Sequence, residues 1–137
     1  MFADDYSPTS SLLPYEPIAL QEYPFLGKQV TVKVHVKPFD SILQDHKGID
    51  LVLVDVQGYQ DKVLPGANGI PKSYMVVISE LSLQPLYAGS STFNSVYQFL
   101  VRAGFRLRFL TNPMQGEGQQ ILQIDGVFVR EGAEGTR

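Results

Sequence analysis

Apolar and polar residues alternate strictly where the regular part of the chain begins. In the stretch VTVKVHVK, residues 30–37, the four valines share one parity and the polar side chains share the other. A period of two with one polar side is typical of a half-exposed β-strand. The residues that follow predict a short helix, with Asp40 or Ser41 as its cap and its end near Gly48.

Two later stretches are apolar without alternation. They are IDLVLVDV, residues 49–56, and YMVVISEL, residues 74–81. Short runs rich in β-branched residues are typical of strands covered on both faces, as in parallel sheets. Each run nevertheless finishes on an acid, Asp55 in the first and Glu80 in the second.

Helical periodicity follows each of these apolar runs. Residues 59–64 predict a short helix that Pro65 and Gly66 end. Residues 91–103, STFNSVYQFLVRA, space their apolar side chains as one face of a longer helix. Ser91 or Thr92 can cap its start, and Gly104 stands where a helix commonly ends.

Two more strands are predicted near the C-terminus, joined by the glycine-rich loop NPMQGEGQ. The first covers residues 105–110 and the second covers residues 120–129. Alternation in the first strand places three side chains on one face, namely Phe105, Leu107 and Phe109. Gly126 indicates a bulge in the second strand. Asp125 is either an acid at a functional rim or the partner of that bulge, and the pattern favours the bulge.

The order of these elements predicts an α/β fold. Strands and helices alternate through the middle of the chain, and the last two strands form a hairpin. We therefore expect a mixed sheet with parallel central strands and a C-terminal antiparallel hairpin, in a domain of residues 30–137. Residues 1–29 read as an extended arm, because prolines at 8, 14, 17 and 24 interrupt every helix that could form there.

Composition narrows the class of protein. The chain has 137 residues and a net charge of −3, which suits one ordinary domain and argues against nucleic acid or an anionic membrane as its partner. No apolar run approaches the roughly 20 residues that span a bilayer. The start, MFADDYSPTSS, lacks the basic and apolar regions of a secretory signal. With no cysteine, thiolate chemistry is excluded and a cytoplasmic location is expected.

The acids that end the two apolar strands are the candidate catalytic residues. Ligands of open α/β sheets bind beyond the carboxyl ends of the strands, so Asp55 and Glu80 share one rim if their strands are parallel neighbours. Gly58 permits a sharp turn that leaves Gln57 and Tyr59 beside this rim. Two alternatives stay open: Asp55 as a cap of the next helix, and Glu80 as a structural acid.

The histidines do not indicate a metal site or a hydrolase. His35 stands between two lysines on the polar side of a predicted strand, where an exposed side chain is expected. His46 has Asp45 and Asp50 nearby, but their spacing matches no dedicated metal motif, so no metal is predicted. The stretch GSST lacks the Gly-x-Ser-x-Gly elbow of α/β-hydrolases.

Several of these segments resemble the motifs of one known family. IDLVLVDVQGYQDKVLPGA resembles the signature of FkbM-type methyltransferases, in which an apolar strand runs into Asp-Val-(Gln/Glu)-Gly and then a Val-Leu-x-Gly-Ala helix. Similar segments occur in family order, namely SSLLP, VTVKVHVKPFDSIL, ISELSLQPLYAGSSTF, FLVRAGFRL and QIDGVFVR. The resemblance implies a Rossmann-like class I methyltransferase fold. It also implies methyl transfer from S-adenosylmethionine, typically to a hydroxyl oxygen of a sugar or a polyketide-type product.

The resemblance assigns roles to residues around the first strand end. Asp55, and after it Glu80, would take or orient the hydroxyl proton of the acceptor. Gln57, Tyr59 and Gln60 would bind the acceptor. Gln60 stands where the family usually has Glu, and an amide cannot act as a base. Leu53 stands where the family commonly has Lys or Trp.

The cofactor motif of the family has no counterpart in this sequence. Class I enzymes hold the cofactor on a glycine-rich turn after the first strand, with an acid at the end of the second strand. The glycines at 66–69 and 116–118 follow the wrong elements. The sequence thus resembles the second half of the family domain, which implies a complementing N-terminal half or a homodimer as partner. A catalytically inactive remnant that serves as a binding or dimerisation module is the alternative.

Overall fold

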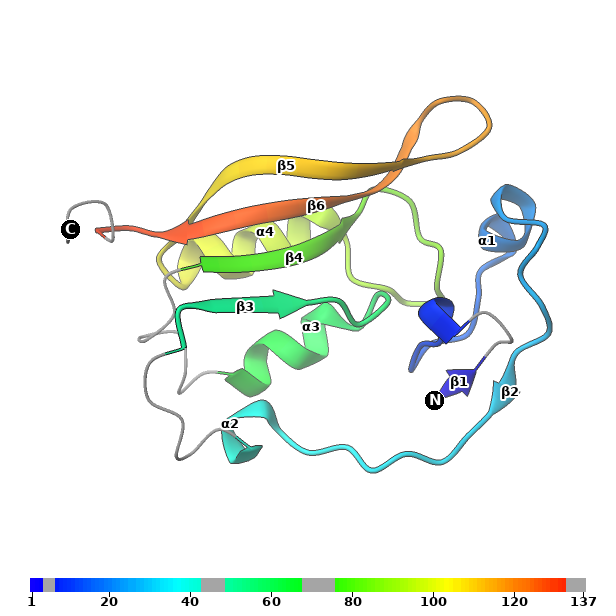
Figure 1. Ribbon diagram of the computed structural model, residues 1–137, viewed down its shortest axis with the longest axis horizontal. Coiled ribbons are helices and arrows are strands. Elements are labelled where there is room, and N and C mark those ends of the chain that lie inside the picture. Colours follow the sequence, from blue (N-terminus) through cyan, green and yellow to red (C-terminus); the bar gives the residue numbers. More distant parts are fainter. Residues whose placement is uncertain (4–6, 43–48, 68–75, 133–137) are drawn as a thin grey trace.

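Four strands form the main sheet of the protein. The computed structural model describes residues 1–3, 7–42, 49–67 and 76–132. The spatial order is β3 (Leu51–Val54), β4 (Val76–Ser82), β6 (Ile121–Arg130) and β5 (Phe105–Gln115) (Figure 1). β3 and β4 are parallel, whereas β6 is antiparallel to both β4 and β5. The predicted α/β fold with a mixed sheet and a C-terminal hairpin is confirmed.

The position of the parallel strands differs from the prediction. The parallel pair lies at one edge of the sheet and not at its centre, because β6 inserts between β4 and β5. β4 and β5 run in the same direction, since each is antiparallel to the strand between them. The α/β crossover from β4 to β5 therefore skips one position, which the last strand of the chain then fills. The assignment to a Rossmann-like half-fold stays a prediction.

The longest helix lies against one face of this sheet. α4 (Phe93–Arg102) is seen behind the strands in Figure 1. A capping box begins it: Thr92 Oγ1 accepts from the Ser95 N–H at 3.1 Å, and Ser95 Oγ accepts from the Thr92 N–H at 3.0 Å. Gly104, with φ of +87°, follows its end. The predicted helix and its Thr92 cap are confirmed. No helix in the described ranges has the length and apolarity to cross a membrane.

Shorter helices flank β3. α2 (Phe39–Ile42) precedes it, and α3 (Gln60–Val63) follows it and continues as the 3₁₀ turn η2 (Leu64–Ala67). The α-helix ends before Pro65, as predicted, and the chain continues through Pro65 and Gly66 as a 3₁₀ turn. The predicted end of the helix near Gly48 and the first two residues of the run 74–81 lie outside the described residues.

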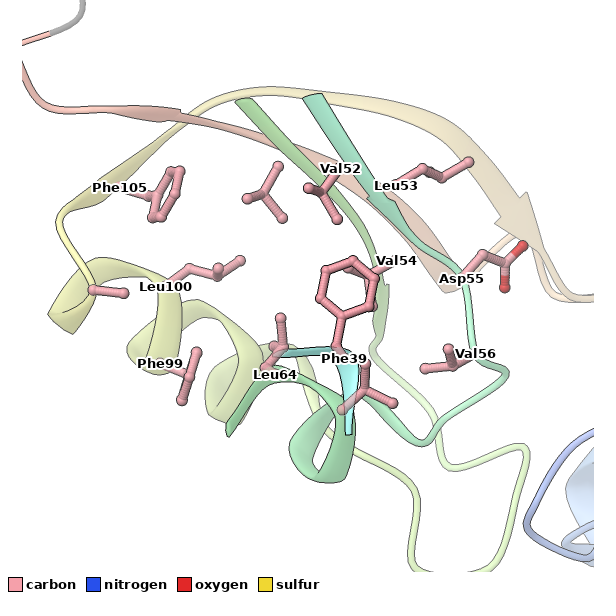
Figure 2. Close-up of a pocket in the computed structure, with 13 residues that line it drawn as sticks. Phe39, Val52, Leu53, Val54, Asp55, Val56, Leu64, Phe99, Leu100 and Phe105 are labelled. Carbon is pink, nitrogen blue, oxygen red and sulfur yellow. The ribbon is translucent and has the colours of Figure 1, made fainter. Parts of the chain in front are cut away.

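The main core lies between the sheet and α4. Its buried side chains come from the strands, from α4 and from η2, and they are Val54, Leu64, Val77, Leu81, Val96, Leu100, Phe105, Ile124 and Phe128. The side chains of β4 that face α4 alternate with those of the opposite face, as a pleated strand requires. An apolar cleft of about 210 Å³ continues this core beneath β3 (Figure 2).

The opposite face of β3 is open. Val54 is buried, but Leu51 is 52% exposed and Leu53 is 63% exposed. Figure 2 shows the Leu53 side chain extending to the opposite side of β3 from Val52. The prediction of a strand covered on both faces is therefore wrong. β3 is an edge strand, and the helices packed against it lie on one side only.

A bulge in β5 reverses its alternation. Leu107 pairs with Phe128 and Phe109 pairs with Val127, so Arg108 is the extra residue. Phe109 consequently lies on the face opposite Leu107 and is 67% exposed, which contradicts the predicted shared face. Gly126 marks no bulge of its own. A Cβ there would lie 2.6 Å from Leu81 Cδ1, so glycine is needed for close packing.

The N-terminal residues are not extended throughout. α1 (Pro17–Glu22) begins with the proline that was expected to interrupt a helix, because the first helical position needs no N–H donor. Ser7–Thr9 forms the 3₁₀ turn η1. A second core cluster joins this region to the sheet through Ala19, Leu86, Tyr87 and Leu122. The predicted extended arm is thus corrected to a segment that packs on the domain.

Most residues of the first predicted strand, 30–37, are described by the structure but do not form a strand. Only β2 (Val30–Thr31) forms, and it pairs with β1 (Phe2–Ala3) in a separate two-stranded sheet. Beyond it, Val34 is 42% exposed and Val36 is 70% exposed. An alternating segment becomes a strand only where a neighbour pairs with it, and β1 is too short to pair with more than two residues.

Candidate functional site

Three carboxylates form a row across the sheet. Val54 pairs with Ser79 in the parallel ladder, so the next residues, Asp55 and Glu80, lie side by side at the carboxyl end of β3. Glu80 in turn pairs directly with Asp125 of β6. Residues at matching register positions project from the same face of a sheet. The structure therefore brings Asp55 and Glu80 to one rim and adds Asp125 beside them.

A pocket of about 460 Å³ opens along this row. Besides the three acids, its walls hold amide and aromatic side chains from several parts of the chain, including Gln57, Asn112, Gln123, Tyr15, Tyr23, Phe25 and Tyr87. The N-terminal segment thus contributes a wall of the pocket. Sequence reasoning missed the residues outside the strand ends, because no spacing rule connects Tyr15 or Asn112 to Glu80.

The turn after β3 fixes Gln57 over the pocket. Gln57 has φ of +46° and Gly58 has φ of +89°, so two successive residues adopt left-handed backbone conformations. Gln57 Nε2 donates to Asp55 Oδ1 at 2.9 Å, and Tyr87 Oη donates to Gln57 Oε1 at 2.8 Å. Ser11 Oγ holds the same turn by donating to the Gln57 carbonyl at 2.7 Å. Gln57 thereby orients Asp55, which is exposed.

Glu80 carries a strongly perturbed carboxyl group. Burial, and then the nearby charges of Asp55 and Asp125, raise its pKa to about 7. Its Oε2 is buried without a hydrogen-bond partner in the described part of the chain. The amide of Gln60 lies beside this carboxyl and lowers the pKa in part, although neither polar atom of that amide meets hydrogen-bond geometry with a described partner. Near neutral pH, Glu80 can therefore both hold and release a proton.

Asp125 combines the two roles that the sequence left open. It lines the pocket, and it pairs with Thr111 where β5 loses its regular register. Asn112, which has φ of +50°, donates from Nδ2 to Asp125 Oδ2 at 2.9 Å. Asp125 is thus both a rim acid and the partner of an irregular strand segment.

The remaining predicted site residues occupy different positions. Tyr59 stands at the N-cap position of α3 and is not part of the pocket wall. Gln60 is 1% exposed and lies behind Glu80, so it faces the carboxyl and not the open pocket. His46 and Asp45 lie outside the described residues. Within the described ranges, no group of three or more His, Asp or Glu side chains has an arrangement that could hold a metal ion.

The residues present do not fit a complete S-adenosylmethionine site. The glycine turn nearest the acids is Gly58, and a Cβ there would lie 2.8 Å from Ser90 Cβ. This turn is filled by the protein itself, whereas a cofactor-binding turn needs open space above its glycines. At Gly116 the same position is occupied by Glu22 and Gln120.

The fold and the site define an α/β domain with an acidic ligand pocket at the carboxyl ends of its parallel strands. Residues 6–107 match the methyltransferase FkbM domain, and the chain belongs to this family. The match includes the N-terminal segment that forms one pocket wall and most of the carboxylate row, but not Asp125. No curated protein and no solved structure matches the chain.

Proposed function

We propose that this chain supplies the acceptor side of an S-adenosylmethionine-dependent O-methyltransferase whose acceptor is a small molecule or a glycan with a free hydroxyl. Family membership supports methyl transfer. The row of carboxylates beside an open pocket is the observation that supports binding of the acceptor by this chain. Because the sequence carries no glycine-rich turn after a first strand, and the turn at Gly58 is filled by the protein itself, cofactor binding would depend on a complementing N-terminal half or on a second copy.

Glu80 is the proposed proton acceptor for the hydroxyl. A general base works best when its pKa is close to the pH at which the enzyme operates, and the pKa of Glu80 is about 7. Asp55, held by Gln57, would orient the hydroxyl from the other side. This assignment reverses the order expected from the sequence, in which Asp55 came first.

Methyl transfer from labelled S-adenosylmethionine to a panel of hydroxylated small molecules tests this function. The assay uses the chain with an added segment that carries a strand, a glycine-rich turn and a helix. We expect Glu80→Gln to lower the rate by about 100-fold or more, as for loss of a general base. Asp50→Asn, at the other end of β3, should leave the rate unchanged. Transfer by Glu80→Gln at the normal rate would reject Glu80 as the base, and no transfer by the unmutated chain would reject the function.

A binding or dimerisation module without catalysis is the second candidate. The specific observation in its favour is the open face of β3, where Leu51 and Leu53 are more than half exposed. β3 has no neighbour on its outer edge among the described strands, and such edges readily pair with another chain. This candidate predicts self-association without methyl transfer.

A further inference from the structure

The pocket carries uncompensated negative charge. Among the described residues that line it, none is Lys, Arg or His, whereas three are carboxylic acids. Two arginines of the sheet are engaged elsewhere: Arg106 forms an ion pair with Glu131, and Arg130 stacks over the Phe105 ring at 4.3 Å. An anionic acceptor would be repelled by this pocket.

Polar groups beside the row lack the partners that burial normally demands. Gln60 is 1% exposed, and neither its Nε2 nor its Oε1 has a partner in the described part of the chain. Glu80 Oε2 is in the same condition. Gln60 faces the Glu80 carboxyl and not the pocket, so of these two side chains only Glu80, which lines the pocket, can present a carboxyl oxygen to a ligand. Carboxylate oxygens accept only, and a donor-rich group would satisfy them.

Aromatic rings also line the pocket. Tyr15 and Tyr87 lie 5.5 Å apart between ring centroids, and Tyr23 and Phe25 lie 5.8 Å apart. All four rings line the space above the acids. Faces of such rings attract cations, and the effect grows when the cation is removed from water. Carboxylates and aromatic rings that line the same pocket are an environment that an ammonium group prefers.

From this arrangement we infer that the acceptor is a positively charged molecule, a polyol that bears an ammonium group which binds to Asp55 and Asp125 and leaves Glu80 to take the hydroxyl proton. The inference rests on the proposed acceptor role of the pocket. A metal ion is the poorer occupant, because the described acids lack an arrangement suited to one.

Three polyols of matched size and different charge test the inference. Glucamine is cationic, sorbitol is neutral and gluconate is anionic, and each is titrated into the full chain at pH 7 with chemical shifts as the readout. We expect glucamine to bind about tenfold or more tightly than sorbitol, and gluconate not to bind. Asp55→Asn should weaken glucamine binding about fivefold or more, and Asp50→Asn should not.

The outcomes distinguish a failure of this inference from a failure of the proposed function on which it rests. Equal binding of sorbitol and glucamine would overturn the inference and leave the acceptor pocket standing. An equal loss of glucamine affinity in Asp55→Asn and Asp50→Asn would also overturn the inference. The attraction of the cation would then come from the net negative charge of the chain and not from the pocket. Binding of none of the three polyols by the folded chain would count against the pocket itself, and hence against the proposed function as well.

Discussion

Glu80 shows how one residue takes its chemistry from its neighbours. As a sequence position it is an acid at the end of an apolar run, equally compatible with a structural role. In the structure, β3 and β6 each place an acid next to it, and the buried Gln60 closes the space behind it. The two acids beside Glu80 are distant in the sequence: Asp55 is 25 residues before it and Asp125 is 45 residues after it. The pKa of Glu80 therefore depends on the register between the strands that bring these residues together.

The raised pKa of Glu80 predicts a pH-dependent cost in stability. Since the folded pKa of about 7 lies above the ordinary 4.5, the folded state favours the protonated acid. This cost in the free energy of unfolding is absent below about pH 4.5 and grows as the pH rises from 4.5 towards 7. Above about pH 7 it reaches its full size. Glu80→Gln should therefore raise the free energy of unfolding at pH 8 by on the order of 2 kcal/mol, and by much less at pH 5.

Urea unfolding of the parent and the variant at both pH values checks this expectation. Asp50→Asn serves as the matched control, because Asp50 is exposed at the amino end of β3 and away from the row. A gain from Glu80→Gln that is the same at pH 5 and pH 8 would show that charge is not its cause.

At the scale of elements, the sequence predicted the order of strands and helices but not their surroundings. Helical periodicity located α4, and an unbroken apolar run located β4, because both signals are local in the sequence. It could not reveal that β3 lies at an edge, or that Arg108 forms a bulge, since both depend on the partner strand. The acids Asp55 and Glu80 were found from their strand ends, whereas Tyr15 and Asn112 carried no signal.

The turn after β3 provides a prediction at this scale. Gly58 and Gly89 both have positive φ, but a Cβ at Gly58 meets Ser90 at 2.8 Å and a Cβ at Gly89 meets nothing within 4 Å. Gly89→Ala should cost about 1 kcal/mol from backbone strain alone. Gly58→Ala adds a steric clash and should cost about 2–4 kcal/mol. Thermal or urea unfolding compares the two variants directly, and equal costs would mean that the turn relaxes freely.

At the scale of the whole molecule, the sheet is covered on one face and open on the other. α4 packs on the covered face, and the open face carries Leu51, Leu53 and Phe109, each more than half exposed. Parallel strands normally occur with both faces covered, so the sequence of β3 is typical of an interior position that this arrangement does not give it. A covering partner would bury these side chains and would approach the carboxylate row, because Asp55 continues directly from β3.

Leu53→Lys tests whether the open face controls association. A charged residue on an edge strand prevents pairing with other chains, and Leu53 makes little contribution to the core because it is 63% exposed. We expect the parent chain to sediment as a dimer or larger species and Leu53→Lys to sediment as a monomer. The free energy of unfolding should change by no more than about 0.5 kcal/mol.

Arg106→Lys is a suitable control, since Arg106 is also exposed on the sheet but forms an ion pair that lysine can keep. If Leu53→Lys associates as the parent does, the open face is not the site of self-association, and the dimerisation module loses its main support. If it becomes monomeric, adding the complementing half distinguishes the two functions. If the complementing half covers the same face, Leu53→Lys should also weaken methyl transfer, whereas a dimerisation module would have no transfer to lose.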